Sequence, residues 1–166
     1  IKVDTIYLPS GFLTKPEMDF SDAIATIATF NTTESVKKII DHELAHFYCD
    51  KMREKALGRD YHFLMYSLFQ EEIIAHKLVS EGIAEYFNKR MNGDDEKPFL
   101  FQNWPSHLSE FTTRDVYQGG YTIVKPIIDQ HGEKGIQFLL FNPPTPYELY
   151  TPEKYQERMF TAIEKL

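Results

Sequence analysis

The sequence is poor in several features that identify common classes of protein. Its 166 residues include a single cysteine, Cys49, which excludes an internal disulfide. Basic residues number 18 against 25 acidic ones, the net charge is -7, and no basic run is present. This balance argues against a nucleic-acid partner held through phosphate contacts. No apolar run approaches the roughly 20 residues that a membrane-spanning helix requires.

The chain also lacks an initiator methionine and a signal-type segment, because it begins directly at Ile1. We interpret it as a processed product or as part of a longer chain. Processing favours a secreted or cell-envelope location over a cytoplasmic one. The sequence does not indicate an oligomeric state.

What the chain does contain is enough apolar and aromatic material for one packed domain. Hydrophobic residues make up 42% of the sequence and aromatic residues 14%, so we expect an ordered core rather than disorder. We predict a single domain over residues 1–166. A sheet-rich part is expected over residues 1–32 and a mainly helical part over residues 33–166.

The order of residue patterns predicts strands first and helices afterwards. Residues 1–8 and 23–30 are rich in β-branched and apolar residues, which favours strands. Apolar residues at helical spacing predict long helices over residues 33–57, 61–91 and 113–131, with shorter helices behind them. Pro126 should kink or break the third of these helices, and Gly132 should cap it.

The first predicted helix carries an HExxH motif, HELAH, at residues 42–46. Two histidines four residues apart lie on one helix face one turn apart, so His42 and His46 can bind the same metal ion. Glu43 then lies beside the ion, where its carboxylate can take a proton from a water molecule that the metal activates. The alternative is an amphipathic helix that carries two histidines by chance.

A catalytic zinc site needs a third protein ligand and leaves one position open for water. In the extended pattern HExxHxxGxxH that ligand is a nearby histidine, but Cys49 and Met52 occupy the glycine and histidine positions. The metzincin pattern is therefore excluded, and Cys49 is better interpreted as a small buried side chain than as a ligand. A glutamate from a later helix is the remaining common solution, and the segment SEGIAEY at residues 80–86 offers one.

HELAH followed downstream by EGIAEYF resembles the gluzincin metallopeptidases, the group that includes thermolysin and the aminopeptidase N family. The resemblance implies an α+β fold, a zincin-like catalytic domain with a small N-terminal sheet over a mostly helical C-terminal part. It implies Zn2+ in the cleft between these parts, held by His42, His46 and Glu81, with Glu43 as the general base.

The same resemblance implies residues that support the metal ligands. Glu85, one turn after Glu81, matches the acidic residue that orients a zinc-binding histidine in the thermolysin branch. A ligating imidazole needs its second N–H held by a carboxylate or a carbonyl, which agrees with this role. A solvated helix charge is the alternative for Glu85. Asp50, one turn after His46, is a further candidate for the supporting role.

A third segment, VYQGG at residues 116–120, precedes an apolar helix and resembles the Tyr-x-x-Gly stretch of the aminopeptidase N family. The resemblance implies that Tyr117 stabilises the transition state, with Tyr121 as its rival one turn later. A packing aromatic is the plain alternative. The chain has no Gly-x-Met-Glu-Asn segment to hold a free amino terminus, so endopeptidase and exopeptidase activity both stay open.

Together these residues predict a zinc-dependent peptidase that hydrolyses peptide bonds in a peptide or protein substrate. Residues 23–30 would either lie along the cleft and pair with an extended substrate, or form a plain core strand. Two other functions stay open. One is a zincin-like binding or regulatory module that does not cleave, and the other is a zinc hydrolase that acts on a non-peptide substrate.

Overall fold

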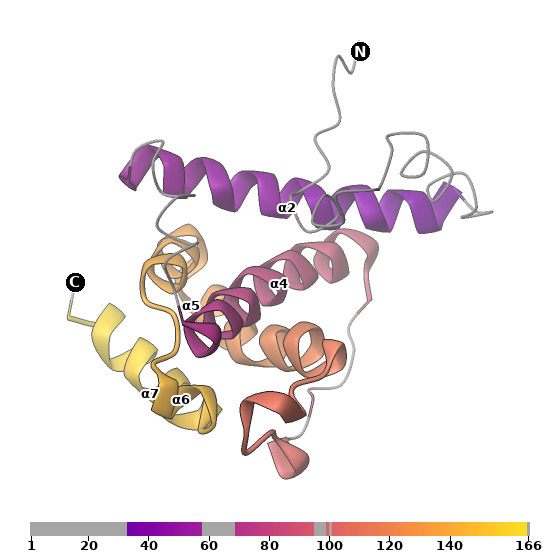
Figure 1. Cartoon of the computed structure of the whole chain (residues 1–166). Helices are drawn as coiled ribbons and strands as arrows, with labels where there is room; N and C mark the ends of the chain where they lie inside the picture. Colours follow the sequence, from indigo (N-terminus) through magenta and orange to yellow (C-terminus); the bar gives the residue numbers. More distant parts are fainter. Residues whose placement is uncertain (1–32, 58–68, 95–98, 100, 166) are drawn as a thin grey trace.

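The computed structural model describes residues 33–57, 69–94, 99 and 101–165, and every regular element in these ranges is helical. The α-helices are α2 (Thr33–Leu57), α4 (Gln70–Asn92), α5 (Gly120–Phe141), α6 (Pro146–Leu149) and α7 (Pro152–Ile163). Three short helices lie between α4 and α5, namely η1 (Phe101–Asn103), η2 (Leu108–Glu110) and the π-helical turn η3 (Asp115–Gly119). Figure 1 shows α2 lying along the outside of the group formed by the other α-helices.

The fold of the described residues is all-helical, and the expected α+β fold is therefore wrong for this part of the chain. No strand occurs within the described ranges. Helices such as α4 and α5 bury their apolar faces against each other, so neither needs a sheet as its packing layer. The strands expected over residues 1–8 and 23–30 lie outside the described residues.

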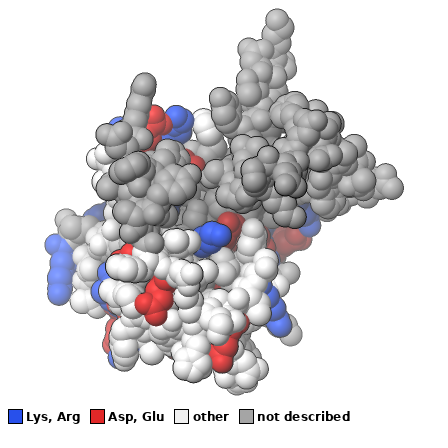
Figure 2. All heavy atoms as spheres, in the orientation of Figure 1, with Lys and Arg blue, Asp and Glu red and all other residues white. Residues whose placement is uncertain are grey.

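The charged side chains of the described surface are mixed in sign. On the face shown in Figure 2, acidic and basic residues lie scattered among uncharged ones rather than gathered by sign. Among the helices that the structure describes, none combines the length and the apolarity needed to cross a membrane.

Helix α4 is the central element, because α2 packs on one side of it and α5 on another. Its buried side chains recur three and four residues apart, as the helical period requires for one continuous face. The helix begins where the Phe69 N–H donates to the Glu72 carboxylate at 2.9 Å. It ends at Gly93, whose φ of 71° suits glycine and whose N–H donates to the carbonyl of Lys89.

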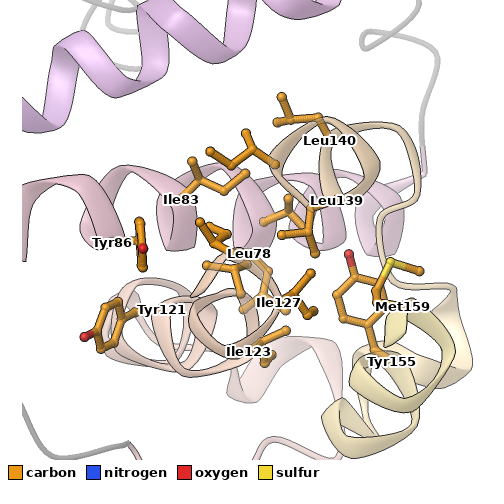
Figure 3. Close-up of a cluster of buried hydrophobic side chains, with 14 of the residues drawn as sticks. Leu78, Ile83, Tyr86, Tyr121, Ile123, Ile127, Leu139, Leu140, Tyr155 and Met159 are labelled. Carbon is orange, nitrogen blue, oxygen red and sulfur yellow. The ribbon is translucent and has the colours of Figure 1, made fainter. Parts of the chain in front are cut away.

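The hydrophobic core lies between α4, α5 and α7 (Figure 3). Large aliphatic side chains of α4 and α5 meet Tyr155 and Met159 of α7 there, and both α7 side chains are fully buried. Each fully buried side chain of this size contributes roughly 1.5 to 3 kcal/mol through the apolar surface it removes from water. The fully buried aliphatic members include Leu78, Ile83, Ile123, Ile127 and Leu139.

Helix α4 and the start of α5 cross with their backbones in direct contact at Gly82 and Gly120. A Cβ atom on Gly82 would lie 2.4 Å from the carbonyl carbon of Gly120. A Cβ atom on Gly120 would lie 2.3 Å from the carbonyl oxygen of Leu78. No side chain fits at either position, so the two glycines let the π-helical turn η3 pack directly against α4.

Helix α5 contains the break that the sequence suggested, at Gly132. The only non-helical backbone within α5 is Gly132, with φ 57° and ψ -135°, a conformation that favours glycine. Pro126 lies inside the helical stretch before it. The prediction of a cap at Gly132 is therefore confirmed, and of the kink or break expected at Pro126, the break does not occur.

Helix α2 buries polar side chains and exposes several large apolar ones, although Ala45 and Cys49 are also buried. Asp41, His42 and Arg53 are buried. Leu44 and Phe47, in contrast, expose 56% and 52% of their surface. A helix that packed only to bury apolar surface would show the opposite arrangement. The polar face that α2 shares with α4 is therefore where a functional site is expected.

Candidate metal centre

Two histidine side chains of α2 and one glutamate side chain of α4 converge between these helices. The His42 Nε2 and His46 Nε2 atoms are 3.1 Å apart, as helical spacing allows for residues one turn apart. The Glu81 Oε2 atom lies 3.1 Å from each of these two nitrogens. The three atoms thus form an equilateral triangle, which we call the ligand triangle, and the residues form a group that can hold a metal ion.

The ligand triangle has the size that a tetrahedral metal site requires. Ligand atoms about 2.0 to 2.1 Å from a zinc ion lie roughly 3.3 Å apart at tetrahedral angles. Three protein atoms leave the fourth position of such a site open. Two imidazole nitrogens and a carboxylate oxygen this close together have few protons to share among themselves, so a cation satisfies their lone pairs better. The residues present therefore fit a divalent metal ion.

The charges of the ligand residues also suit a cation. Burial raises the pKa of Glu81, but hydrogen bonds with His42 and His46 outweigh it and hold the pKa at about 2. Glu81 is therefore ionised at neutral pH. Burial lowers the pKa of His46, but its hydrogen bond with Glu81 and the nearby carboxylates raise that pKa overall. Protons and a metal ion compete for the same nitrogen lone pair, so binding is expected to weaken in acid.

Glu43 lies next to the ligand triangle without belonging to it. Its side chain is half-buried, and its Oε2 atom is buried without a hydrogen-bond partner among the described residues. Burial raises the pKa of Glu43, and the charge of Glu81 adds to this, while His46 and His42 act in the opposite direction. A carboxylate with a raised pKa and an oxygen free of partners can accept and return a proton.

Tyr117 of η3 covers the other side of His42. The two rings are stacked, with centroids 5.5 Å apart and planes 7° from parallel. Burial, together with the charge of Glu81 and a hydrogen bond to it, raises the pKa of Tyr117 to about 12. Tyr121, in contrast, is buried in the core beneath Lys89. The structure therefore places Tyr117 at the ligand triangle and Tyr121 away from it.

The π-helical form of η3 explains how Tyr117 reaches this position. A π-helical turn inserts an extra residue into a helix and changes the direction of the side chains within it, which is why such turns are frequent at functional sites. Gly119 and Gly120 at the end of the turn allow it to lie against Trp104 and α4 without a clash. Both glycines therefore allow close packing of the turn, and this packing in turn sets the position of Tyr117.

Other side chains lie near the far nitrogens of the two histidines. His42 Nδ1 lies 3.8 Å from Glu85 Oε2, so the predicted partner is close to it. His46 Nδ1 lies 3.1 Å from the Ser80 hydroxyl, a partner that the sequence did not reveal. Asp50 accepts a hydrogen bond from Arg53 at 3.4 Å, and its charge helps to raise the pKa of His46.

Ser80 was missed because its role depends on how α2 and α4 pack. The only sequence signal is that it directly precedes Glu81, and a serine in a helix has many neutral explanations. Once Glu81 faces the histidines, the residue before it lies near His46. The packing of the helices, rather than a motif, identifies this residue.

The chain was also compared with known proteins, and no protein-family model, curated protein or solved structure matches it. The geometry of the ligand triangle and of the residues around it is therefore the basis for a function of this chain.

Proposed function

We propose that this chain is a zinc-dependent peptidase that resembles the gluzincins, with His42, His46 and Glu81 as the ligands of Zn2+. The observation that carries the proposal is the ligand triangle, in which three donor atoms lie 3.1 Å from one another. Glu43 and Tyr117 beside it supply an acid–base group and a hydrogen-bond donor. Neither residue is needed to explain the packing of α2 on α4.

The donor set favours zinc over Ca2+ and Mg2+. Two imidazole nitrogens and one carboxylate oxygen are the ligands of hydrolytic zinc enzymes, whereas Ca2+ and Mg2+ prefer sites made of oxygen atoms. Cys49 does not compete for the ion, because its thiol is fully buried and burial raises its pKa to about 12. A nearby thiolate ligand is thereby unavailable at neutral pH.

The protein groups divide the hydrolytic reaction between them. Zinc supplies the Lewis acidity that activates water and polarises the scissile carbonyl group. Glu43 takes the proton of the attacking water at its carboxylate and later delivers it to the leaving amine. Tyr117 stays protonated at neutral pH, because its pKa is about 12, and its hydroxyl donates a hydrogen bond to the oxygen on which negative charge develops.

Metal content tests the site directly. The purified chain should bind about one zinc per molecule after reconstitution, measured by elemental analysis, because the described residues contain one ligand triangle. Glu81→Ala and a His42→Ala, His46→Ala double variant should lose most of this zinc. Zinc retained in full by these variants would move the metal to another place in the chain.

Cleavage of a peptide library with and without a chelator tests the reaction. We expect chelator-sensitive cleavage by the wild type, and none by Glu43→Gln, which should retain its zinc because Glu43 is not a ligand. Glu54→Gln, at the far end of α2, is the matched control and should cleave normally. Zinc binding without any cleavage would favour a binding module, and cleavage of esters alone would favour a non-peptide substrate.

A further inference from the structure

A buried lysine, Lys89, lies on α4 one helical turn beyond Glu85 and two turns beyond Glu81. The Lys89 side chain is only 8% exposed, and its Nζ atom lies 3.0 Å from Glu85 Oε1. The same Nζ atom lies 5.2 Å from the ring centre of Tyr121, above its face. Burial of a lysine is costly unless its charge is paired, so the contact with Glu85 offsets a real penalty.

Three charged residues follow one another along α4 at intervals of one helical turn. Glu81 contributes to the ligand triangle, Glu85 faces His42, and Lys89 pairs with Glu85. Carboxylates at positions i and i+4 of a helix repel each other. A positive charge on the far side of Glu85 offsets that repulsion and holds the Glu85 carboxylate in place.

The two oxygens of Glu85 have different partners. Oε1 contacts Lys89 at 3.0 Å, and Oε2 lies 3.8 Å from His42 Nδ1. The second distance is longer than a hydrogen bond, so a small rotation of the carboxylate decides whether that bond forms. Because Lys89 contacts one oxygen of the Glu85 carboxylate, it limits this rotation.

We propose that Lys89 is a positioning residue for the metal ligand His42 and acts through Glu85. The proposal rests on the metal-binding function proposed above. It adds a residue that influences metal binding but lies outside both the HELAH and the EGIAEYF segments. A partner that holds the second N–H of a ligating histidine strengthens metal binding, and its loss typically costs 10 to 100-fold in affinity. Lys89 is one step further away, so its loss is expected to cost roughly tenfold.

A double-mutant cycle on zinc affinity tests this chain of contacts. Competition with a chromogenic chelator would measure the zinc Kd of the wild type, Lys89→Met, Glu85→Gln and the double variant. We expect Lys89→Met to weaken binding roughly tenfold and Glu85→Gln at least as much. In the Glu85→Gln background, Lys89→Met should have no further effect, because the residue through which it acts is gone.

The control variant is Lys125→Met, which removes another lysine that pairs with a carboxylate four residues away, Asp129 of α5. Its zinc Kd should stay within twofold of the wild type. Lys89→Arg keeps the charge and should retain most of the affinity. If Lys89→Met does not fold, Lys89→Gln, which keeps a donor without the charge, takes its place with the same expectations.

A nuclear magnetic resonance measurement separates positioning from stability. In the zinc-loaded wild type, the Nδ1 proton of His42 should be protected from exchange by Glu85, and Lys89→Met should remove this protection. An unchanged Kd and proton signal in Lys89→Met would overturn the proposal, as would an equal loss of affinity in both backgrounds. A wild type that binds no zinc would instead overturn the proposed function itself.

Discussion

At the scale of single residues, Tyr117 and Tyr121, two tyrosines one turn apart, have different environments. Tyr117 stacks on His42 and hydrogen bonds to Glu81. Tyr121 is 4% exposed and packs in the core. A hydroxyl beside the ligand triangle can contact a substrate, whereas one in the core cannot. Single-atom changes at these positions therefore test the proposed reaction without altering the packing volume.

Tyr117→Phe should lower kcat about 10²- to 10³-fold, because the hydrogen bond to the developing oxyanion exists mainly in the transition state. KM and zinc content should change little, and steady-state kinetics with a cleaved peptide would measure both constants. Tyr121→Phe is the matched control and should leave kcat within about twofold. The opposite result, with the loss in Tyr121→Phe alone, would assign the role to Tyr121.

At the scale of elements, the candidate metal centre depends on two helix contacts. The packing of α2 on α4 brings Glu81 to the histidines, and the crossing of α4 with η3 and α5 brings Tyr117 to His42. The second contact has no room for a side chain at Gly82 or Gly120. The C-terminal helices α6 and α7 are joined by a separate ion pair between Glu148 and Arg158.

Gly120→Ala should separate α4 from η3, because the new Cβ atom would lie 2.3 Å from the Leu78 carbonyl oxygen. Overpacking of this kind typically lowers the free energy of unfolding by about 1 to 3 kcal/mol. The displacement should also lower kcat, because Tyr117 moves with η3. Denaturant unfolding and kinetics would measure the two effects. Gln118→Ala in the same turn is the control, and equal stability of the two variants would contradict the close crossing.

The Glu148 carboxylate accepts hydrogen bonds from Arg158 Nε at 2.6 Å and from the Thr145 backbone N–H at 2.9 Å. Burial raises the pKa of Glu148, but these bonds outweigh it and lower the pKa overall. Because the pKa of Glu148 is lower in the folded chain than in the unfolded chain, its ionised carboxylate stabilises the fold at pH values above the unfolded pKa of about 4.3. This contribution is lost as the pH falls through the folded value.

Arg158→Met should therefore lower the free energy of unfolding by about 1 to 3 kcal/mol near pH 7, since it leaves a buried carboxylate without its main partner. The difference from the wild type should shrink in acid, as Glu148 becomes protonated in both proteins. Thermal unfolding of the metal-free proteins between pH 3 and 7 would measure it. Lys154→Met, which breaks an exposed pair with Glu157, should show little effect at any pH.

At the scale of the whole molecule, α2 is the least integrated of the long helices. It packs mainly on α4, and its apolar side chains Leu44 and Phe47 point outward rather than into the core. The core between α4, α5 and α7 does not include the ligand triangle. A metal ion held by residues from both α2 and α4 would therefore join α2 to the rest of the molecule.

Zinc should raise the melting temperature, because it binds the folded chain and not the separated ligands. At a free zinc concentration of 100 times Kd, the stabilisation is about 2.7 kcal/mol. This corresponds to roughly 5 to 10 °C for a domain of this size. Differential scanning calorimetry with zinc and with a chelator would measure the shift. The His42→Ala variant should show no shift, and an equal rise in that variant would point to zinc bound elsewhere.

The sequence by itself determined the part of the site that lies within one helix. His42 and His46 must lie on one face because the helical period is 3.6 residues, and the structure shows their Nε2 atoms 3.1 Å apart. Local signals also located Gly132 as a helix break, because positive φ favours glycine. Glu81 was named from its resemblance to a family motif, and the structure brings it to both histidines.

Only the tertiary structure decided what lies between elements. The strands behind the α+β prediction were expected over residues 1–8 and 23–30, which lie outside the described residues, whereas every regular element within the described ranges is helical and packs against other helices. The choice of Tyr117 over Tyr121 at the triangle depended on the π-helical turn and the glycine crossing. No sequence motif identifies Ser80 or Lys89. Their contacts depend on which helix faces pack together, and local periodicity does not specify that packing.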